Sequence, residues 1–331
     1  MPDINLNLPE TAKNLVKPAN KLIEVVSGAI GKVYEPTNIR RLAKARADEI
    51  ETIAKVARKN NDTPIKYESE EVLIDASSYK ELEKRAANRF MLQEAKKQHN
   101  IEVVMNKAHK ILEDEDDVVD SPVNQDWITR FISSIEDISN ETMQDVWAKI
   151  LAGEIKRPQT FSLRALETVK NLSSDEAQLF QSVAPLILTD GNRFFLPNDS
   201  TLLKKHNIPY STLLKLDECG LISSNSMIAT DFKMLRRKSP IIYNQSALVK
   251  MYDPNNIQEK VTVLVFLLHG SGEQLFQAIQ AASSSNIEFV IDFAETLRTK
   301  YSMLNISAHK VNSIDGSTIN FQESDILPKK H

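Results

Sequence analysis

The sequence is poor in cysteine, glycine and long apolar runs, and each shortage excludes a class of protein. Cys219 is the only cysteine among 331 residues, so no disulfide can form within the chain, which fits a reducing compartment. Eight glycines are too few for a glycine-rich nucleotide-binding architecture. No apolar run reaches the roughly 18 residues of a membrane-spanning helix, and the N-terminus MPDINLNLPE lacks the order of a signal peptide. We therefore expect a cytoplasmic protein.

Net charge is also small, with 41 Lys and Arg against 45 Asp and Glu, which gives a formal charge of −4. A balance this close to neutral does not by itself indicate a nucleic-acid or membrane partner. Two basic clusters are nevertheless candidate nucleic-acid contacts, and they consist of Arg40, Arg41, Lys233, Arg236, Arg237 and Lys238. Acidic residues interleaved with the first cluster favour an ordinary solvated helix face there.

Patterns that could carry catalysis or bind a metal are few. His269-Gly270-Ser271-Gly272 follows an apolar run and is similar to an oxyanion loop, but no G-x-S-x-G elbow supplies a nucleophile. The six histidines show no i, i+4 pair and no Cys/His cluster, so no zinc site is predicted. Cys219 is interpreted as a small buried hydrophobe. We identify no catalytic residue, no metal site, no cofactor and no small-molecule substrate, which favours a protein that is not an enzyme.

Hydrophobic periodicity predicts a mainly α fold, with a helical N-terminal two-thirds and a C-terminal α+β domain. The expected organisation along the chain is N-terminal helices over residues 1–60, an irregular linker over 61–78, a helical domain over 79–185, the α+β domain over 186–325 and a tail over 326–331.

The centre of the chain has the clearest helical signals. Four short helices joined by tight turns are expected between residues 125 and 185. Ser139 or Asn140 can cap the second of them, and Gly153 is expected to stop it. The spacing of Ser173 and Glu176 predicts a capping box at the start of the fourth.

The C-terminal region has strand-like runs in NRFFLP, SPIIYNQSALVKMY and KVTVLVFLL, and a hairpin is expected to turn at Asp315-Gly316. The stretch IPYSTLLKLDECGLISS predicts a helix over residues 208–218, a turn at Gly220 and then a strand. An apolar helix that leads into a hairpin is typical of winged-helix folds. This winged-helix-like segment, with the basic cluster that follows it, supports a nucleic-acid-binding hypothesis.

WAKILAGEIKRP, residues 147–158, is the most distinctive stretch, and its spacing indicates scaffold. Apolar residues repeat at helical spacing in this motif and in the neighbouring helix, so that each helix has one apolar face. A tryptophan on such a face contributes a large buried area. The predicted structural core of the motif consists of Trp127, Met143, Trp147, Leu151 and Gly153.

Residues 124–180, from NQDWITRF to SSDEAQLF, resemble an uncharacterised bacterial domain family related to the Abi-alpha (abortive infection alpha) proteins. The positions that carry the resemblance are Asp126-Trp127, Met143-Gln144, Trp147-Ala148, Leu151-Ala152, Ser162 and Leu172-Ser173. A looser likeness reaches VTVLVFLLHGSGEQLF, where His269-Gly270 stands in place of a threonine. The resemblance implies a role in bacterial phage defence. It implies no catalytic residues, because none are established for the family.

Three functional hypotheses follow from the sequence. The first is a non-enzymatic interaction protein of phage defence, which works through a protein partner or self-association. The second is a winged-helix-type nucleic-acid-binding protein. The third is an effector that acts at the membrane surface through the N-terminal helix of residues 20–34, although Glu24 interrupts the apolar stripe of that helix.

Overall fold

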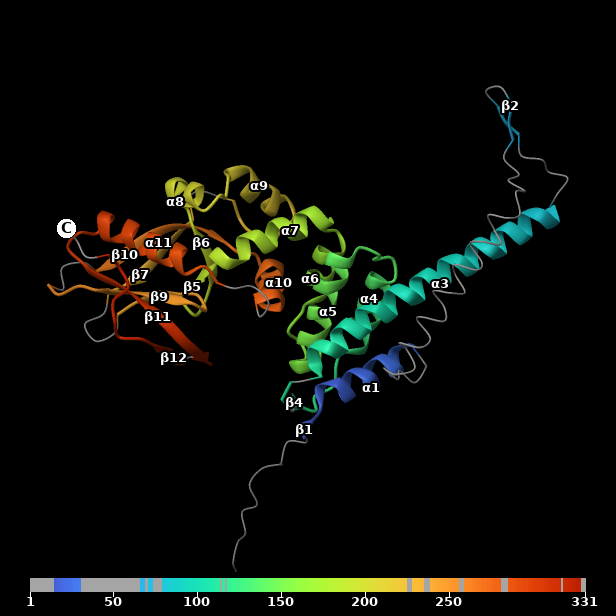
Figure 1. Cartoon of the computed structure of the whole chain (residues 1–331), viewed down its shortest axis with the longest axis horizontal. Helices are drawn as coiled ribbons and strands as arrows, with labels where there is room; N and C mark the ends of the chain where they lie inside the picture. Colours follow the sequence, from blue (N-terminus) through green and yellow to red (C-terminus); the bar gives the residue numbers. More distant parts are fainter. Residues whose placement is uncertain are drawn as a thin grey trace, which may run out of the picture. The chain divides into compact units, whose positions relative to one another are not determined.

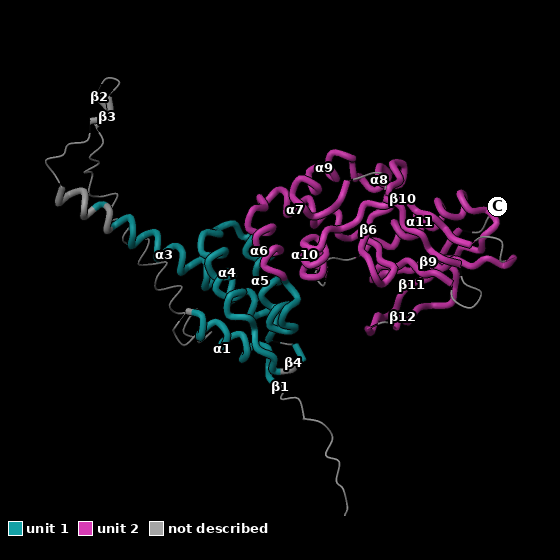
Figure 2. Tube along the Cα trace, turned by 180° about the vertical axis from the view of Figure 1, so that it is seen from behind, with its two compact units in different colours: residues 1–161 teal, residues 162–331 magenta. Residues whose placement is uncertain are grey.

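A computed structural model shows two compact units, one ending at Phe161 and the other beginning at Ser162 (Figures 1 and 2). We refer to them as unit 1 and unit 2. The structure describes residues 15–30, 66–68, 71–73, 79–113, 115–116, 118–224, 228–234, 239–255, 259–280, 285–316 and 318–328. Residues 31–60 of the predicted N-terminal helices, most of the predicted linker, and the candidate contacts Arg40, Arg41, Arg236, Arg237 and Lys238 lie outside these residues.

Unit 1 is a helical bundle with short strand pairs. Its described helices are α1 (Pro18–Ile30), α3 (Tyr79–Leu112), α4 (Gln125–Ile135) and α5 (Glu141–Lys156). Helix α3 packs against α4 and α5, and α1 packs against all three. The strands β1 (Leu15–Val16) and β4 (Val118–Val119) pair antiparallel, as do β2 (Lys66–Glu68) and β3 (Glu71–Leu73).

An aromatic cluster forms the centre of the unit 1 core. The Trp127 and Phe131 rings stack at 5.1 Å between centroids, and Phe131 meets Trp147 edge-on at 5.4 Å. All three side chains are buried. Such contacts stabilise a fold beyond the area they bury, so the three aromatic residues fix how α4 packs on α5.

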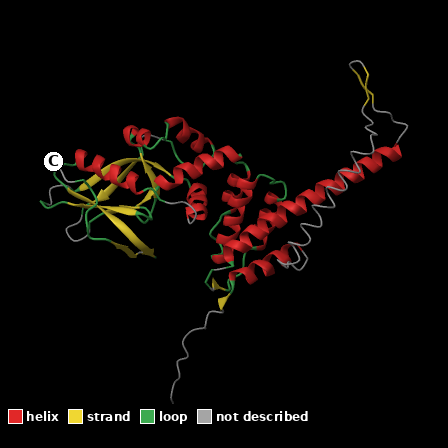
Figure 3. Cartoon of the chain, in the orientation of Figure 1, coloured by secondary structure: helices red, strands yellow, loops and turns green. Residues whose placement is uncertain are grey.

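Unit 2 contains one large antiparallel sheet of eight strands (Figure 3). The order of strands across the sheet is β12-β11-β9-β8-β5-β6-β10-β7. Their bounds are β5 (Leu188–Thr189), β6 (Phe194–Pro197), β7 (Ala229–Lys233), β8 (Ile241–Tyr243), β9 (Ala247–Tyr252), β10 (Lys260–Leu267), β11 (Asn305–Asp315) and β12 (Thr318–Phe321).

Helices precede the strands of this sheet and lie between them in the sequence. They are α6 (Leu163–Lys170), α7 (Ser174–Val183), a 3₁₀ turn (Ala184–Leu186), α8 (Ser200–Lys205), α9 (Tyr210–Glu218), α10 (Gly270–Gln280) and α11 (Ile287–Lys300). Helix α11 packs on β9 and β11 and also contacts α8, while α10 packs on α6 and α7 packs on α9.

The prediction of a mainly α fold is wrong. Helix accounts for 53% and strand for 20% of the described residues, and an eight-stranded sheet makes the protein mixed α/β. The N-terminal two-thirds is not simply helical, because sheet strands begin at Leu188 and further short strand pairs lie in unit 1. Strands β1 to β5, of two or three residues each, carry too little periodicity to be recognised in the sequence.

The four short helices predicted between residues 125 and 185 are confirmed as α4 to α7. Asn140 caps α5 by accepting a hydrogen bond from the Met143 amide, and Ser173 and Glu176 form the predicted capping box. The predicted stop at Gly153 is wrong, because α5 continues to Lys156. A glycine inside a helix weakens it without ending it, and here the chain turns only before Pro158.

The strands that follow α9 do not form the local hairpin expected of a winged-helix-like segment. Strand β7 pairs with β10 rather than with β8, the next strand along the chain. Alternation in β7 buries Thr230 and Phe232, and the long β10 has buried residues at the positions that pair with them.

The hairpin predicted at Asp315-Gly316 is confirmed between β11 and β12, with Gly316 in the left-handed region at φ +56.

A close backbone contact joins the end of α9 to the start of α10. A Cβ placed on Gly272 would lie 1.9 Å from the Leu221 carbonyl oxygen, closer than any side chain tolerates. The same oxygen accepts a hydrogen bond from the His269 amide at 2.9 Å. The segment HGSG therefore ends β10 and opens α10, and Gly272 is the residue that permits the close approach.

We predict that Gly272→Ala lowers the free energy of unfolding by about 3 kcal/mol or more, because the overlap is with backbone that cannot rotate away. Gly270→Ala is the matched control, since a Cβ at Gly270 meets nothing within 4 Å. Urea unfolding of both variants measures the difference. Equal stability of the two variants would contradict the contact.

Candidate functional site

The WAKILAGEIKRP motif lies in the interior of unit 1. Trp127, Met143, Trp147 and Leu151 are all buried, with Trp147 fully enclosed. A Cβ on Gly153 would lie 2.8 Å from the Phe161 ring, so the glycine makes room for that ring to pack against α5. These contacts assign the motif residues to the packing of α5 and of the turn that follows it.

Glu154 was not singled out by the sequence, yet it organises this turn. The residue is 1% exposed, and its carboxylate accepts hydrogen bonds from the amides of Gln159 at 2.7 Å and Phe161 at 3.0 Å. Gln159 has a positive φ of 72, which such amide bonds help to hold. Burial raises the pKa of Glu154, while the amide bonds and the charge of Lys21 oppose the rise. The available signal was its place on the same helical side as Leu151 and Ile150, three and four residues earlier, within the apolar stretch ILAGEI.

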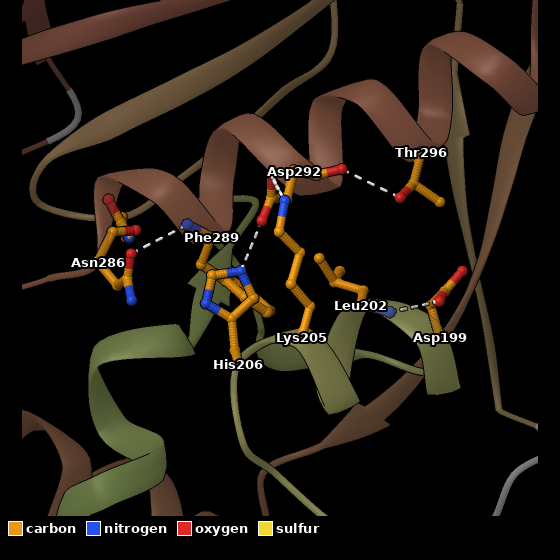
Figure 4. Close-up of polar contacts among 9 residues, drawn as sticks. Asp199, Leu202, Lys205, His206, Asn286, Phe289, Asp292 and Thr296 are labelled. Atoms are coloured by element: carbon orange, nitrogen blue, oxygen red, sulfur yellow. Dashed lines mark hydrogen bonds and ion pairs between the residues drawn. The ribbon is translucent and has the colours of Figure 1, made fainter.

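In unit 2, a charged brace ties α8 to α11 (Figure 4). Asp292 of α11 accepts hydrogen bonds from His206 Nε2 at 2.8 Å and Lys205 Nζ at 2.7 Å. Because a carboxylate only accepts, the His206 hydrogen lies on Nε2. The His206 ring also meets Phe289 edge-on at 5.0 Å. Asp292 and His206 are nearly buried, so the brace holds the end of α8 in place.

Helix α9 follows this brace directly and is fixed at both of its ends. After α8, the Ile208 amide donates to the Leu203 carbonyl at 2.9 Å around Asn207, whose φ is 59. After α9, the Leu221 amide donates to the Leu216 carbonyl at 3.0 Å around Gly220, whose φ is 69. Both are Schellman motifs. They set the direction in which the chain enters and leaves α9.

One face of α9 is packed and the other is open. Thr212, Leu213 and Leu216 are buried, whereas Tyr210 is 53% exposed and Leu214 is 42% exposed. Tyr210 and Leu214 are four residues apart and therefore neighbours on the helix surface. The described structure thus presents an apolar pair, which we call the α9 face, on a helix whose position is fixed.

Of the six predicted nucleic-acid contacts, only Lys233 lies within the described residues. Lys233 is exposed at the end of β7 and pairs in register with Lys260 of β10. Lys260 Nζ forms an ion pair with Asp231 at 2.7 Å, so neighbouring charge partly cancels. The other members of both basic clusters lie outside the described residues.

Two further residues or segments proposed from the sequence are placed by the structure. Cys219 is half-buried rather than buried, and burial raises the pKa of its thiol to about 11, which keeps it protonated at neutral pH. The apolar residues Leu22 and Val26 of α1 are buried within unit 1. Among the described residues, no helix combines the length and apolarity needed to cross a membrane.

These features define a two-unit α/β protein with a helical bundle and an antiparallel sheet. A family model described as "Protein of unknown function (DUF2806)" matches residues 84–291. Because this match spans more than half of the chain, the protein belongs to the DUF2806 family, which agrees with the predicted membership of a domain family of unknown function. No curated protein and no solved structure matches the chain.

Replacing Glu154 with glutamine is expected to change how stability depends on pH. A raised pKa means that the folded protein retains a proton that the unfolded chain has released, in the window above the ordinary value of 4.5. As pH rises through that window, the wild-type free energy of unfolding falls, and Glu154→Gln removes this contribution.

Urea unfolding at a series of mildly acidic to neutral pH values measures the effect. Glu94→Gln, at an exposed position of α3, is the control and should keep the wild-type profile. A Glu154→Gln profile parallel to that of the wild type would contradict the role assigned to burial.

Proposed function

We propose that this chain is a non-enzymatic protein-interaction module that acts in bacterial phage defence and binds a partner protein through the α9 face. The observation that carries the proposal is the exposed apolar pair Tyr210 and Leu214 on a helix held by two Schellman motifs and the Asp292 brace. A rigid apolar anchor loses little conformational entropy when it is covered, which favours protein binding.

The charge around α9 favours a protein partner over nucleic acid. The exposed charged residues of the helix are Lys215 and Glu218, which cancel. Residues 162–331 as a whole hold 17 Lys and Arg against 17 Asp and Glu. Most nucleic-acid affinity comes from neutralised phosphates, and an apolar, neutral helix face provides no such contact.

The phage-defence setting is supported by the resemblance of residues 124–180 to Abi-alpha-related proteins. The structure supplies a physical context for these residues, because Trp127 and Trp147 pack α4 on α5 through Phe131, and Glu154 holds the turn after α5. On this proposal the WAKILAGEIKRP motif maintains the scaffold, and recognition takes place on a different surface.

We expect bacteria that carry the gene to reduce plaquing of at least one phage in a broad panel, and Leu214→Glu to restore plaquing by about 10-fold or more. A charge placed in an apolar contact costs a few kcal/mol when it is covered, and each 1.4 kcal/mol is about tenfold in binding. Met303→Glu is the matched control, because Met303 is 68% exposed in unit 2 and outside α9.

Thermal unfolding of the purified variants verifies that each one folds. If the wild-type gene leaves plaquing unchanged across the panel, the phage-defence proposal fails. If Leu214→Glu protects as well as the wild type does, the α9 face is not the binding surface. A duplex that binds the purified protein with steep salt dependence, and is released by Lys233→Glu, would favour nucleic acid instead.

A further inference from the structure

A pocket in unit 2, distinct from the α9 face, lies where strands β5, β6, β8 and β11 approach the end of α10. It encloses about 410 Å³, within the range of about 300–1,000 Å³ typical of small-molecule sites. The Phe194 ring and the Ile314 side chain provide apolar walls, and Tyr243 provides a phenol. We call it the Tyr243 pocket.

The polar groups of this pocket are hydrogen-bonding groups without charge. Gln245 and Gln280 bring two side-chain amides, and neither amide is hydrogen-bonded to a described residue. The Tyr243 hydroxyl likewise has no hydrogen bond to the described part of the chain. Burial, and secondarily Asp190, raise the pKa of Tyr243, so the hydroxyl is protonated and able to donate at neutral pH. Of the described residues that line the pocket, none is charged.

The walls of the pocket are held by the fold. Asp190 accepts hydrogen bonds from the amides of Asn192 at 3.0 Å and Arg193 at 2.9 Å, and it also pairs with the Arg193 guanidinium. This turn places Gly191, at φ +88, beside the Tyr243 hydroxyl. Phe194 is held edge-on against Phe276 at 5.2 Å. A ligand would therefore meet aromatic surfaces and a phenol that are already in place.

From this lining we propose that the Tyr243 pocket binds an uncharged planar heterocycle with adjacent hydrogen-bond donors and acceptors, which is the chemistry of a nucleobase. A flat ring stacks on aromatic side chains, and a glutamine amide matches a donor and acceptor side by side. A charged group would find no counter-charge among the lining residues. The same base chemistry is offered by a free nucleoside and by an unpaired base in a single strand.

The test is calorimetric titration of the full chain with adenosine, guanosine, cytidine and uridine, and separately with a short single-stranded oligonucleotide. We expect saturable one-to-one binding of at least one nucleoside. Tyr243→Phe should weaken it by about 5- to 10-fold through loss of one hydrogen bond. Gln280→Leu should weaken nucleoside binding more than Tyr243→Phe does, because it removes both the donor and the acceptor of the side-chain amide.

Tyr252→Phe and Gln277→Leu are matched controls at exposed positions outside the pocket, and they should bind as the wild type does. Circular dichroism of each variant establishes that it is folded. Binding of the oligonucleotide alone, with the same dependence on Tyr243, would assign the ligand to a base within a strand. Absence of binding in both titrations, or equal weakening by the control variants, would overturn the proposal.

Discussion

The approach of the Leu221 carbonyl to Gly272 is the contact on which the geometry of unit 2 depends. Leu221 ends the turn after α9, and Gly272 lies in the first turn of α10, so one contact fixes both helices. The next residues continue the connection, with Ile222 bridging Leu268 and the Ser223 amide donating to the Leu267 carbonyl at 2.7 Å. Helix α9 is therefore registered against the end of β10, and its exposed face has a defined position.

Local chemistry made much of this structure predictable. The capping box at Ser173, the cap at Asn140 and the turn at Asp315-Gly316 depend on residues within a few positions of one another. The sheet order could not be predicted, because β7 finds its partner in β10 across two intervening strands. Gly153 shows the same limit: its local signal indicated a helix stop, but its role depends on Phe161.

The proposed binding surfaces were harder to predict from the sequence than the scaffold was. Tyr210 and Leu214 look like ordinary members of an apolar helix, and only the packing of Leu213 and Leu216 shows which face remains open. Tyr243, Phe194 and Gln280 belong to separate elements that the sheet brings together. The role of Glu154 was equally hidden, because its carboxylate is recognised only by the amides of a turn that the fold brings back to it.

The two edge strands of the sheet, β12 and β7, are short and expose polar or charged side chains, and this bears on how copies of the chain behave at high concentration. Strand β12 has only four residues, and β7 carries Asp231 and Lys233 on its exposed face beside Lys260. Short or charged edge strands resist pairing with a neighbouring molecule, since the added strand would form few hydrogen bonds or would force charged side chains out of water. Both edge strands therefore disfavour edge-to-edge aggregation, although the centre of the sheet is strongly hydrophobic.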